Sequence, residues 1–172
     1  MHFINSYRYV QPVVAGGFET RWTTTSVNEV IELPYKSNGV YSGTIDWGDG
    51  SIPVANTYAN RSHTYSTAGD YNIIIDGECS HFDTQSNTTS RDKLKEVLGF
   101  GTYTFSTLRM RQCSNLIGGP NCRDTPIINS GDSGFMFYNN TNMITFQYIE
   151  NWDWTNVPNP FWAFMNCQQF IG

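Results

Sequence analysis

The first half of the chain alternates apolar and polar residues, which is the pattern of strands with one buried face. Four such strands are predicted between residues 18 and 76, and turns rich in glycine and asparagine separate them. Short strands at this spacing predict a small β-sandwich over residues 18–78. The residues expected on buried faces are Phe18, Thr20 and Trp22; Val27, Ile31 and Leu33; Tyr41, Gly43, Ile45 and Trp47; and Tyr71, Ile73 and Ile75.

A paired motif lies at the turn after the third predicted strand and at the start of the fourth. The first part is Thr44-Ile45-Asp46-Trp47-Gly48-Asp49-Gly50-Ser51, and the second is His63-Thr64-Tyr65-Ser66-Thr67-Ala68-Gly69-Asp70-Tyr71. The pair resembles the signature of polycystic-kidney-disease (PKD) domains. That resemblance implies an Ig-like sandwich that serves as a spacer or as a protein- or glycan-binding module, and it implies no catalysis. The motif residues are then fold residues: Asp46, Trp47, Gly48, Asp49, Gly50, His63, Tyr65, Gly69 and Tyr71.

Several residues of this motif have an expected structural role. Trp47 should fill the sandwich, and the carboxylate of Asp49 should cap the tight turn. Tyr65 and Tyr71 should pack on either side of a turn that Gly69 makes possible. His63 is expected to be a strand residue that is hydrogen-bonded near the turn, and not a zinc ligand.

A sequence repeat with a period of 27 organises the second half of the chain. Segments 110–117, 137–144 and 164–171 align without a gap and keep apolar residues at three shared positions. A period of this length is typical of leucine-rich repeats (LRRs). Residues 79–92 are polar and show no periodicity, so they are predicted to be a linker between the sandwich and repeats over 93–172. Residues 1–17 are predicted to be an N-terminal arm that could dock onto a partner.

The segment before the last repeat carries a second resemblance. Ile149-Glu150-Asn151-Trp152-Asp153-Trp154-Thr155-Asn156-Val157 resembles the Trp-Asp-Thr-Ser-Asn-Val segment of an LRR family common in bacterial surface proteins. Residues 94–101 resemble a shorter first rung of the same family. The resemblance implies a short solenoid. Pro158, Pro160 and the glycine-rich stretch 118–134 depart from the pattern, and they leave the regularity of the middle rung open.

A fourth repeat position is polar or sulfur-bearing. Cys113, Asn140 and Cys167 occupy it, and they are expected to form an inward column that satisfies backbone groups. Cys113 and Cys167 lie two rungs apart, about 10 Å at strand spacing. A disulfide requires Cα atoms within about 7 Å, so these two should not be bonded. A bond between Cys79 and Cys122 stays open.

Composition narrows the partner classes. The net charge is −5 and no basic stripe is interleaved with aromatics, so nucleic acid is not an expected partner. No stretch is long enough to span a membrane, and residues 1–8 lack the features of a signal peptide. The expected partners are other protein subunits, including further copies of this chain, or a surface glycan.

The motifs that resemble catalytic or metal-binding sites are expected to have structural roles. Gly131-Asp132-Ser133-Gly134 copies the residues around a trypsin-like nucleophile, but no matching histidine and aspartate precede it in the required context, so a surface turn is expected. Asp46, Asp49 and Asp70 do not have the spacing of an EF-hand, although a calcium ion near the first two stays open. The three histidines are scattered. No catalytic residue, cofactor or metal is therefore predicted.

Aromatic residues gather near the end of the sequence. They are candidates for a partner surface, and the alternative is that they fill the last rung. A solenoid needs its terminal rung covered, so a partner is expected over residues 164–172. The predicted function is that of a non-enzymatic structural or binding protein on a virion surface, such as a phage decoration, fibre or tail component. A bacterial cell-surface adhesin fragment and a non-catalytic accessory module of a secreted enzyme are the alternatives. The candidate residues are Trp152, Trp154, Phe161, Trp162, Phe164 and Phe170.

Overall fold

The protein is mainly β in a computed structural model that describes residues 16–129 and 132–171. Short 3-10 turns are present, and no α-helix occurs within these ranges. Most of the predicted N-terminal arm, residues 1–15, lies outside the described residues. The predicted fold class is therefore confirmed at the level of a β-rich protein.

The largest sheet is antiparallel and contains the two longest strands. Its strand order is β4-β3-β6-β1-β8, and β1 and β6 pair along their length from Phe18 opposite Ile75 to Thr24 opposite Gly69. The alternation predicted for β1 is confirmed, because every second residue from Phe18 to Thr24 is buried. The strands are β1 (Phe18–Thr24), β3 (Thr44–Asp46), β4 (Val54–Ala55), β6 (Gly69–Asp76) and β8 (Leu94–Gly99).

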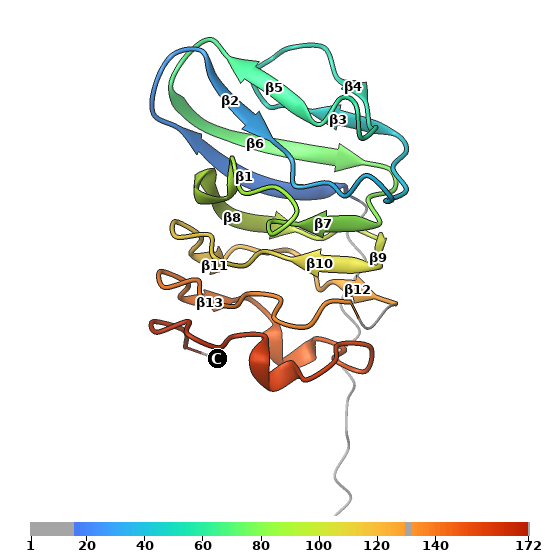
Figure 1. Cartoon of the computed structure of the whole chain (residues 1–172), viewed down its shortest axis with the longest axis vertical. Coiled ribbons are helices and arrows are strands. Elements are labelled where there is room, and N and C mark those ends of the chain that lie inside the picture. The colour runs from blue at the N-terminus through green and yellow to red at the C-terminus, as the bar shows by residue number, and fades with distance from the viewer. Residues whose placement is uncertain (1–15, 130–131, 172) are drawn as a thin grey trace, which may run out of the picture.

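A second, two-stranded sheet lies against the large one (Figure 1). It consists of β2 (Glu29–Glu32) and β5 (Ser62–Tyr65), which pair antiparallel. Tyr65 of this sheet packs on Tyr71 of β6, with ring centroids 4.0 Å apart. Side chains from both sheets are fully buried, including Ile31, Tyr65 and Ile73. The two sheets therefore enclose an apolar core between them.

The expected burial of Val27 and Gly43 is wrong. Val27 is 66% exposed, whereas Ile31 and Leu33 are buried as predicted. Val27 lies in the turn before β2, where Asn28 has a positive φ of 57°. Gly43 is exposed too, and its φ of 88° places it outside the regular part of β3. A turn breaks the period of two, so alternation counted through it assigns the wrong face.

Below the large sheet, short strands pair in parallel and stack along the long axis of the molecule (Figure 1). The backbones of successive sequence repeats are hydrogen-bonded: Ile144 N–H donates to Ile117 O at 2.9 Å, and Ile171 N–H donates to Ile144 O at 2.7 Å. The sequence repeat is thus a hydrogen-bonded ladder of layers. The parallel pairs are β7 (His81–Asp83) with β10 (Thr107–Arg109), β9 (Thr104–Phe105) with β12 (Ile127–Ile128), and β11 (Gly118–Gly119) with β13 (Thr145–Phe146).

Residues 79–92 are not the irregular linker that their polarity predicted. They contain β7 and end at the 3-10 turn η1 (Arg91–Lys93). Phe82 is fully buried, and its ring lies edge-on to Phe18 at 4.9 Å. The Ser90 hydroxyl oxygen accepts a hydrogen bond from Glu32 N–H at 2.9 Å. Strand β7 has three residues and one buried aromatic, Phe82, so it is too short to show a detectable alternation of apolar and polar positions.

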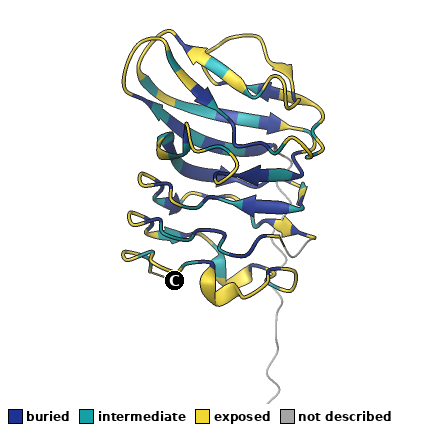
Figure 2. Ribbon diagram, viewed as in Figure 1, coloured by how far each residue is buried: buried dark blue, intermediate teal, exposed yellow. Residues whose placement is uncertain are grey.

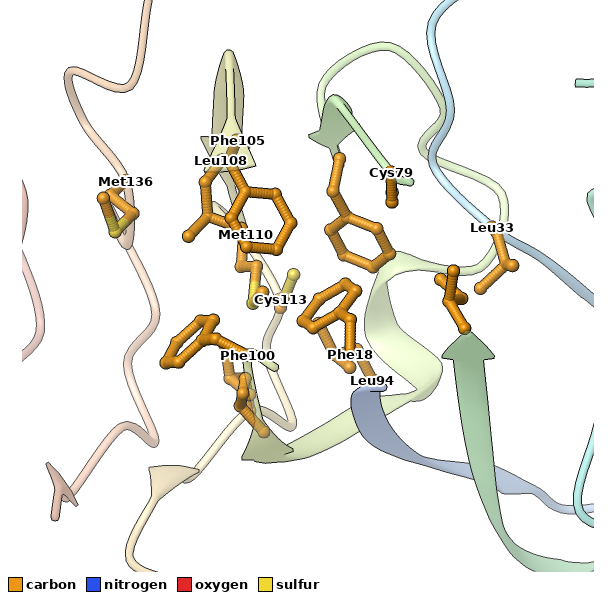
Figure 3. Close-up of a cluster of buried hydrophobic side chains, with 14 of the residues drawn as sticks. Phe18, Leu33, Cys79, Leu94, Phe100, Phe105, Leu108, Met110, Cys113 and Met136 are labelled. Carbon is orange, nitrogen blue, oxygen red and sulfur yellow. The ribbon is translucent and has the colours of Figure 1, made fainter. Parts of the chain in front are cut away.

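The two facing sheets and the layered part share one core. Strand β8, expected as the first rung of the repeats, is also the edge of the large sheet and pairs with β1. Figure 3 shows Phe18 and Leu94 of this sheet beside Phe105 and Met110 of the layers below, all in one cluster of buried side chains. The described chain is therefore one continuous packed body with two kinds of sheet.

Candidate interaction surfaces

The Asp-Trp-Gly-Asp-Gly motif builds a closed turn. Asp46 Oδ1 accepts a hydrogen bond from Gly48 N–H at 2.9 Å, and Asp49 Oδ1 accepts one from Ser51 N–H at 3.0 Å. Asp49 Oδ2 lies 2.7 Å from His63 Nε2. Burial opposes the charge on Asp49, but the hydrogen bonds from Ser51 and His63 outweigh it and lower the pKa of the carboxyl to about 2. Asp49 thus caps the turn, and His63 lies in strand β5 with its ring hydrogen-bonded at the turn, as predicted.

The aromatic residues of the motif hold the turn against the two facing sheets. Trp47 is 1% exposed and stacks on the His63 ring with centroids 5.1 Å apart. The Tyr65 hydroxyl donates a hydrogen bond to Trp47 O at 2.8 Å. Gly48 has a φ of 75°, and a Cβ there would lie 2.3 Å from Asn72 O. Glycine is therefore required at position 48 by both conformation and space.

The role predicted for Gly69 is wrong. Tyr65 and Tyr71 do contact each other, but Gly69 is the first residue of β6 and has no positive φ. A Cβ at Gly69 would have its nearest contact at 3.6 Å, the Tyr71 hydroxyl oxygen. The turn does not require a glycine there, because its geometry is held by Thr24 Oγ1, which accepts a hydrogen bond from Gly69 N–H at 3.1 Å.

The predicted column of Cys113, Asn140 and Cys167 satisfies backbone groups as expected. Asn140 is fully buried, and its Oδ1 accepts a hydrogen bond from Cys113 N–H at 2.7 Å while its Nδ2 donates to Met110 O at 2.5 Å. The Cys167 thiol lies 3.0 Å from Phe137 O. Burial raises the pKa of the Cys113 thiol to about 12. All four cysteines lie in the described part of the chain, and all are free thiols.

Ser133 is not on a surface turn. Its side chain is fully buried, and its Oγ accepts a hydrogen bond from Leu108 N–H at 3.1 Å. Asp132 next to it accepts hydrogen bonds from Lys36 Nζ at 3.1 Å and from the Thr107 hydroxyl at 3.0 Å. The sequence could not show this because the contacts come from segments about 25 and 96 residues away. In this setting Ser133 supports the backbone of β10.

An ion-pair network surrounds Asp132. Its carboxylate and the buried carboxylate of Asp83 share the side chains of Lys36 and Arg109. The distances from Lys36 Nζ are 3.5 Å to Asp83 and 3.1 Å to Asp132. Neither carboxylate is available to hold a metal without losing these cations. Within residues 16–129 and 132–171, no three His, Cys, Asp or Glu side chains are grouped as a metal site.

The aromatic tract divides into a buried and an exposed part. Trp152 is 6% exposed and packs on Phe146 at 4.9 Å, so it fills the core of the layers. Trp154 is half-buried and stacks on Trp152 at 5.4 Å. Phe161 and Trp162 are different, because they are 94% and 45% exposed. Figure 2 shows this exposure over the 3-10 turn η3 (Pro160–Trp162) at the end of the molecule opposite the sandwich.

We define the end face as the surface of the last described layer. It comprises the exposed side chains of Phe161, Trp162, Met165 and Ile171 and the half-buried, stacked rings of Phe164 and Phe170, which are 4.3 Å apart. The N–H groups of Phe164 and Asn166 also belong to it, since no residue of the described chain accepts a hydrogen bond from them. Trp152, Trp154, Phe164 and Phe170 are therefore wholly or partly used in packing. Trp162 is exposed on one side and lies edge-on to the Phe135 ring at 5.2 Å, while Phe161 is almost fully exposed.

Sequence reasoning did not identify a groove on the side of the layers. Its volume is about 480 Å³. The repeat offset that Asn115, Asn142 and Gln169 share is the signal that could have revealed it, because side chains at that offset line one face of the stack. We call it the lateral groove. Its lining residues are Thr23, Lys95, Asn115, Ile117, Asn142, Ile144 and Gln169.

Comparison with known proteins gives no relative. No protein-family model, curated protein or solved structure matches this chain. Among the described residues, no helix has both the length and the apolar character that crossing a bilayer requires. The surfaces of the molecule are therefore the basis for inferring what it does.

Proposed function

We propose that the chain is a non-enzymatic structural subunit that joins a larger protein assembly through its end face. We further propose that residues 18–78 form a PKD-like sandwich and that residues 93–172 form an LRR-like solenoid. The facing sheets and the ladder between successive repeats support this description. A virion surface is the proposed setting, since a rigid subunit that attaches through an end face suits a repeated lattice.

The observation that carries the proposal is the unfinished hydrogen-bond ladder at the end face. Met110 N–H donates to Met136 O at 2.7 Å, and one repeat later Phe137 N–H donates to Ala163 O at 2.8 Å. Phe164 N–H is the next donor in this row. Backbone N–H groups are rarely left without a partner when they are covered, so a covering molecule must supply an acceptor.

A second row of donors ends in the same way. Gln112 N–H donates to Tyr138 O at 2.9 Å, and Asn139 N–H donates to Met165 O at 2.9 Å. Asn166 N–H follows in this row. Two donors separated by one residue match the carbonyl spacing of another polypeptide, as in strand addition to a sheet edge.

Exposed apolar side chains supply the second part of the surface. Phe161, Trp162 and Ile171 are 94%, 45% and 71% exposed, and all three lie in the same layer as the open donors. Trp and Phe are enriched at protein interfaces because they bury large areas with few rotatable bonds. A polypeptide subunit would cover both the rings and the donors, whereas a small polar ligand would leave the rings in water.

Self-association of the purified chain tests the proposal. We expect the mass measured by light scattering to rise with protein concentration as the end face of one copy is covered by another copy. The double variant Phe161→Ser/Trp162→Ser should stay monomeric, because it removes two exposed rings of the end face and replaces no residue of the buried core. Ile52→Ser is the matched control, since Ile52 is 87% exposed and lies outside the end face. A monomer at every concentration, or equal association of both variants, would contradict the proposal.

A further inference from the structure

The lateral groove differs from the end face in both chemistry and position. It runs along the layers from Lys95, in the edge strand β8 of the large sheet, to Gln169 in the last layer. We infer that the lateral groove binds a linear, neutral oligosaccharide. This goes beyond the proposed assembly function, because none of the side chains that line the groove is among the apolar side chains and open N–H groups of the end face.

The amides of the groove are held in fixed orientations by the backbone. Asn115 Nδ2 donates a hydrogen bond to Asp92 O at 2.7 Å, and Asn142 Nδ2 donates to Ser114 O at 2.7 Å. Each Oδ1 is left as an acceptor with no donor from the described chain. The Gln169 side chain makes no hydrogen bond to any described residue. Fixed acceptors lose little entropy on binding, which favours a ligand with matching donors.

The acceptors are repeated at the spacing of the layers. Asn115, Asn142 and Gln169 occupy the same position in successive repeats, and the backbones of these repeats are hydrogen-bonded close by, at Ile117 and Ile144. Hydrogen-bonded strands lie about 4.8 Å apart, so the groove presents one amide at each such step. A ligand that follows the groove must repeat its donors at a similar interval.

An aliphatic strip accompanies the amides. Ile117 and Ile144 line the groove beside them, and Ile144 is 41% exposed. Sugar rings have apolar C–H faces and a rim of hydroxyl donors, so they match a surface that is aliphatic on one side and rich in acceptors on the other. This combination distinguishes the groove from a purely polar depression.

The end of the groove at Thr23 and Lys95 carries no net charge. Lys95 Nζ lies 2.8 Å from Asp70 Oδ2, and the Thr23 hydroxyl donates to Asp70 Oδ1 at 2.5 Å. The hydrogen bond from Lys95 also lowers the pKa of the Asp70 carboxyl. Because both charges are matched within the protein, an ionic ligand gains little here.

The layer spacing favours a sugar chain over a peptide. An extended peptide directs N–H groups to one side only every second residue, about 6.6 Å apart, which does not match steps of about 4.8 Å. A linear hexose chain presents hydroxyl donors on every ring, and the length of one ring in the chain is close to one layer. The groove therefore fits one sugar per layer.

Titration with defined hexasaccharides tests this inference. The probes are β-1,4-linked hexamers of glucose, mannose and N-acetylglucosamine, followed by ¹H–¹⁵N NMR of the Asn115 and Asn142 side-chain amides. We expect at least one probe to shift both amide signals. The variant Gln169→Ala, which removes no internal hydrogen bond, should weaken that binding about threefold to tenfold.

Control variants distinguish binding in the groove from binding elsewhere on the protein. Asn38→Ala replaces an exposed amide outside the groove and should leave the affinity unchanged. The Phe161→Ser/Trp162→Ser variant should also bind the sugar normally, so a failure of the assembly proposal would not imply a failure here. The absence of shifts with all three probes at about 10 mM, where even roughly millimolar affinity gives binding, would overturn the inference. So would stronger shifts with an extended peptide or a sulfated hexamer.

Discussion

Asn140 and Cys113 are joined by a hydrogen bond of 2.7 Å from the Cys113 N–H to the Asn140 Oδ1, although they are 27 residues apart in the chain. Nδ2 of the same Asn140 side chain donates a hydrogen bond to Met110 O. One buried side chain thus satisfies two backbone groups of the neighbouring layer. This contact explains why an amide stands in a row that otherwise holds cysteines.

Replacing Asn140 with alanine should be strongly destabilising. The Cys113 N–H and the Met110 carbonyl would both be buried without a partner, which should lower the free energy of unfolding by about 2–4 kcal/mol. Urea denaturation measures this change. Asn140→Cys should lose less, because cysteine occupies the same position in the neighbouring layers. An Asn140→Ala protein as stable as the wild type would show that the column has no structural role.

Gly48 and Gly69 should respond differently to replacement by alanine. Gly48→Ala places a Cβ 2.3 Å from Asn72 O at a φ of 75°, so we expect a loss of about 1–3 kcal/mol. Gly69→Ala should change stability by less than about 0.5 kcal/mol. Thermal unfolding of both variants measures the difference. Equal effects would contradict the geometry described for the two positions.

Glu29 should make stability depend on acidic pH. The hydrogen bond from Thr25 N–H is the main reason that its pKa falls from 4.5 to about 2, with Lys93 and Ser26 contributing. A carboxyl whose pKa is lower in the folded state stabilises the fold above the unfolded value, and this stability is lost as pH falls from about 4.5 towards 2. The midpoint of urea unfolding, measured at pH 6, 4 and 2.5, should therefore fall less steeply with decreasing pH in the Glu29→Gln variant than in the wild type. If the midpoints of the variant and the wild type fell equally with pH, Glu29 would not be a source of the pH dependence.

The cysteines should react slowly with a thiol reagent in the folded protein. Burial raises the pKa of Cys113 and Cys122 to about 12, and it raises the pKa of Cys79 further. Thiolate is the reactive form, so native protein should show slow colour development with Ellman's reagent and rapid reaction after denaturation. Cys167, the least buried of the four, should react first. Fast reaction of Cys113 would contradict its placement in the core.

Local patterns predicted the fold where a signal lay within one strand or one repeat. Alternation located the buried face of β1, and the offset of 27 located residues that the structure joins by hydrogen bonds, such as Ile117 and Ile144. The pairing of β8 with β1 was not predictable in this way. It depends on contacts between distant segments, such as the ion pair between Arg21 and Glu96, which are 75 residues apart. No local period encodes such a contact.

The interaction surfaces were only partly predictable, for a related reason. Composition marked the aromatic tract, but Trp152 and Phe161 have the same apolar character and opposite exposure, which only the packing of the last layer decides. The lateral groove depends on amides such as Asn115 and Asn142 meeting on one wall. Their shared offset was visible in the sequence, whereas the hollow between the layers and Lys95 was not.

Amide hydrogen exchange at Phe164 and Asn166 tests most directly whether the end face pairs with another polypeptide. In dilute monomer both N–H groups should exchange rapidly, because no described residue accepts their hydrogen bonds. In the assembled form both should slow by at least about tenfold, while the exposed turn at Ile52 should not change. Equal exchange of Phe164 and Asn166 in monomer and assembly would contradict pairing through the end face.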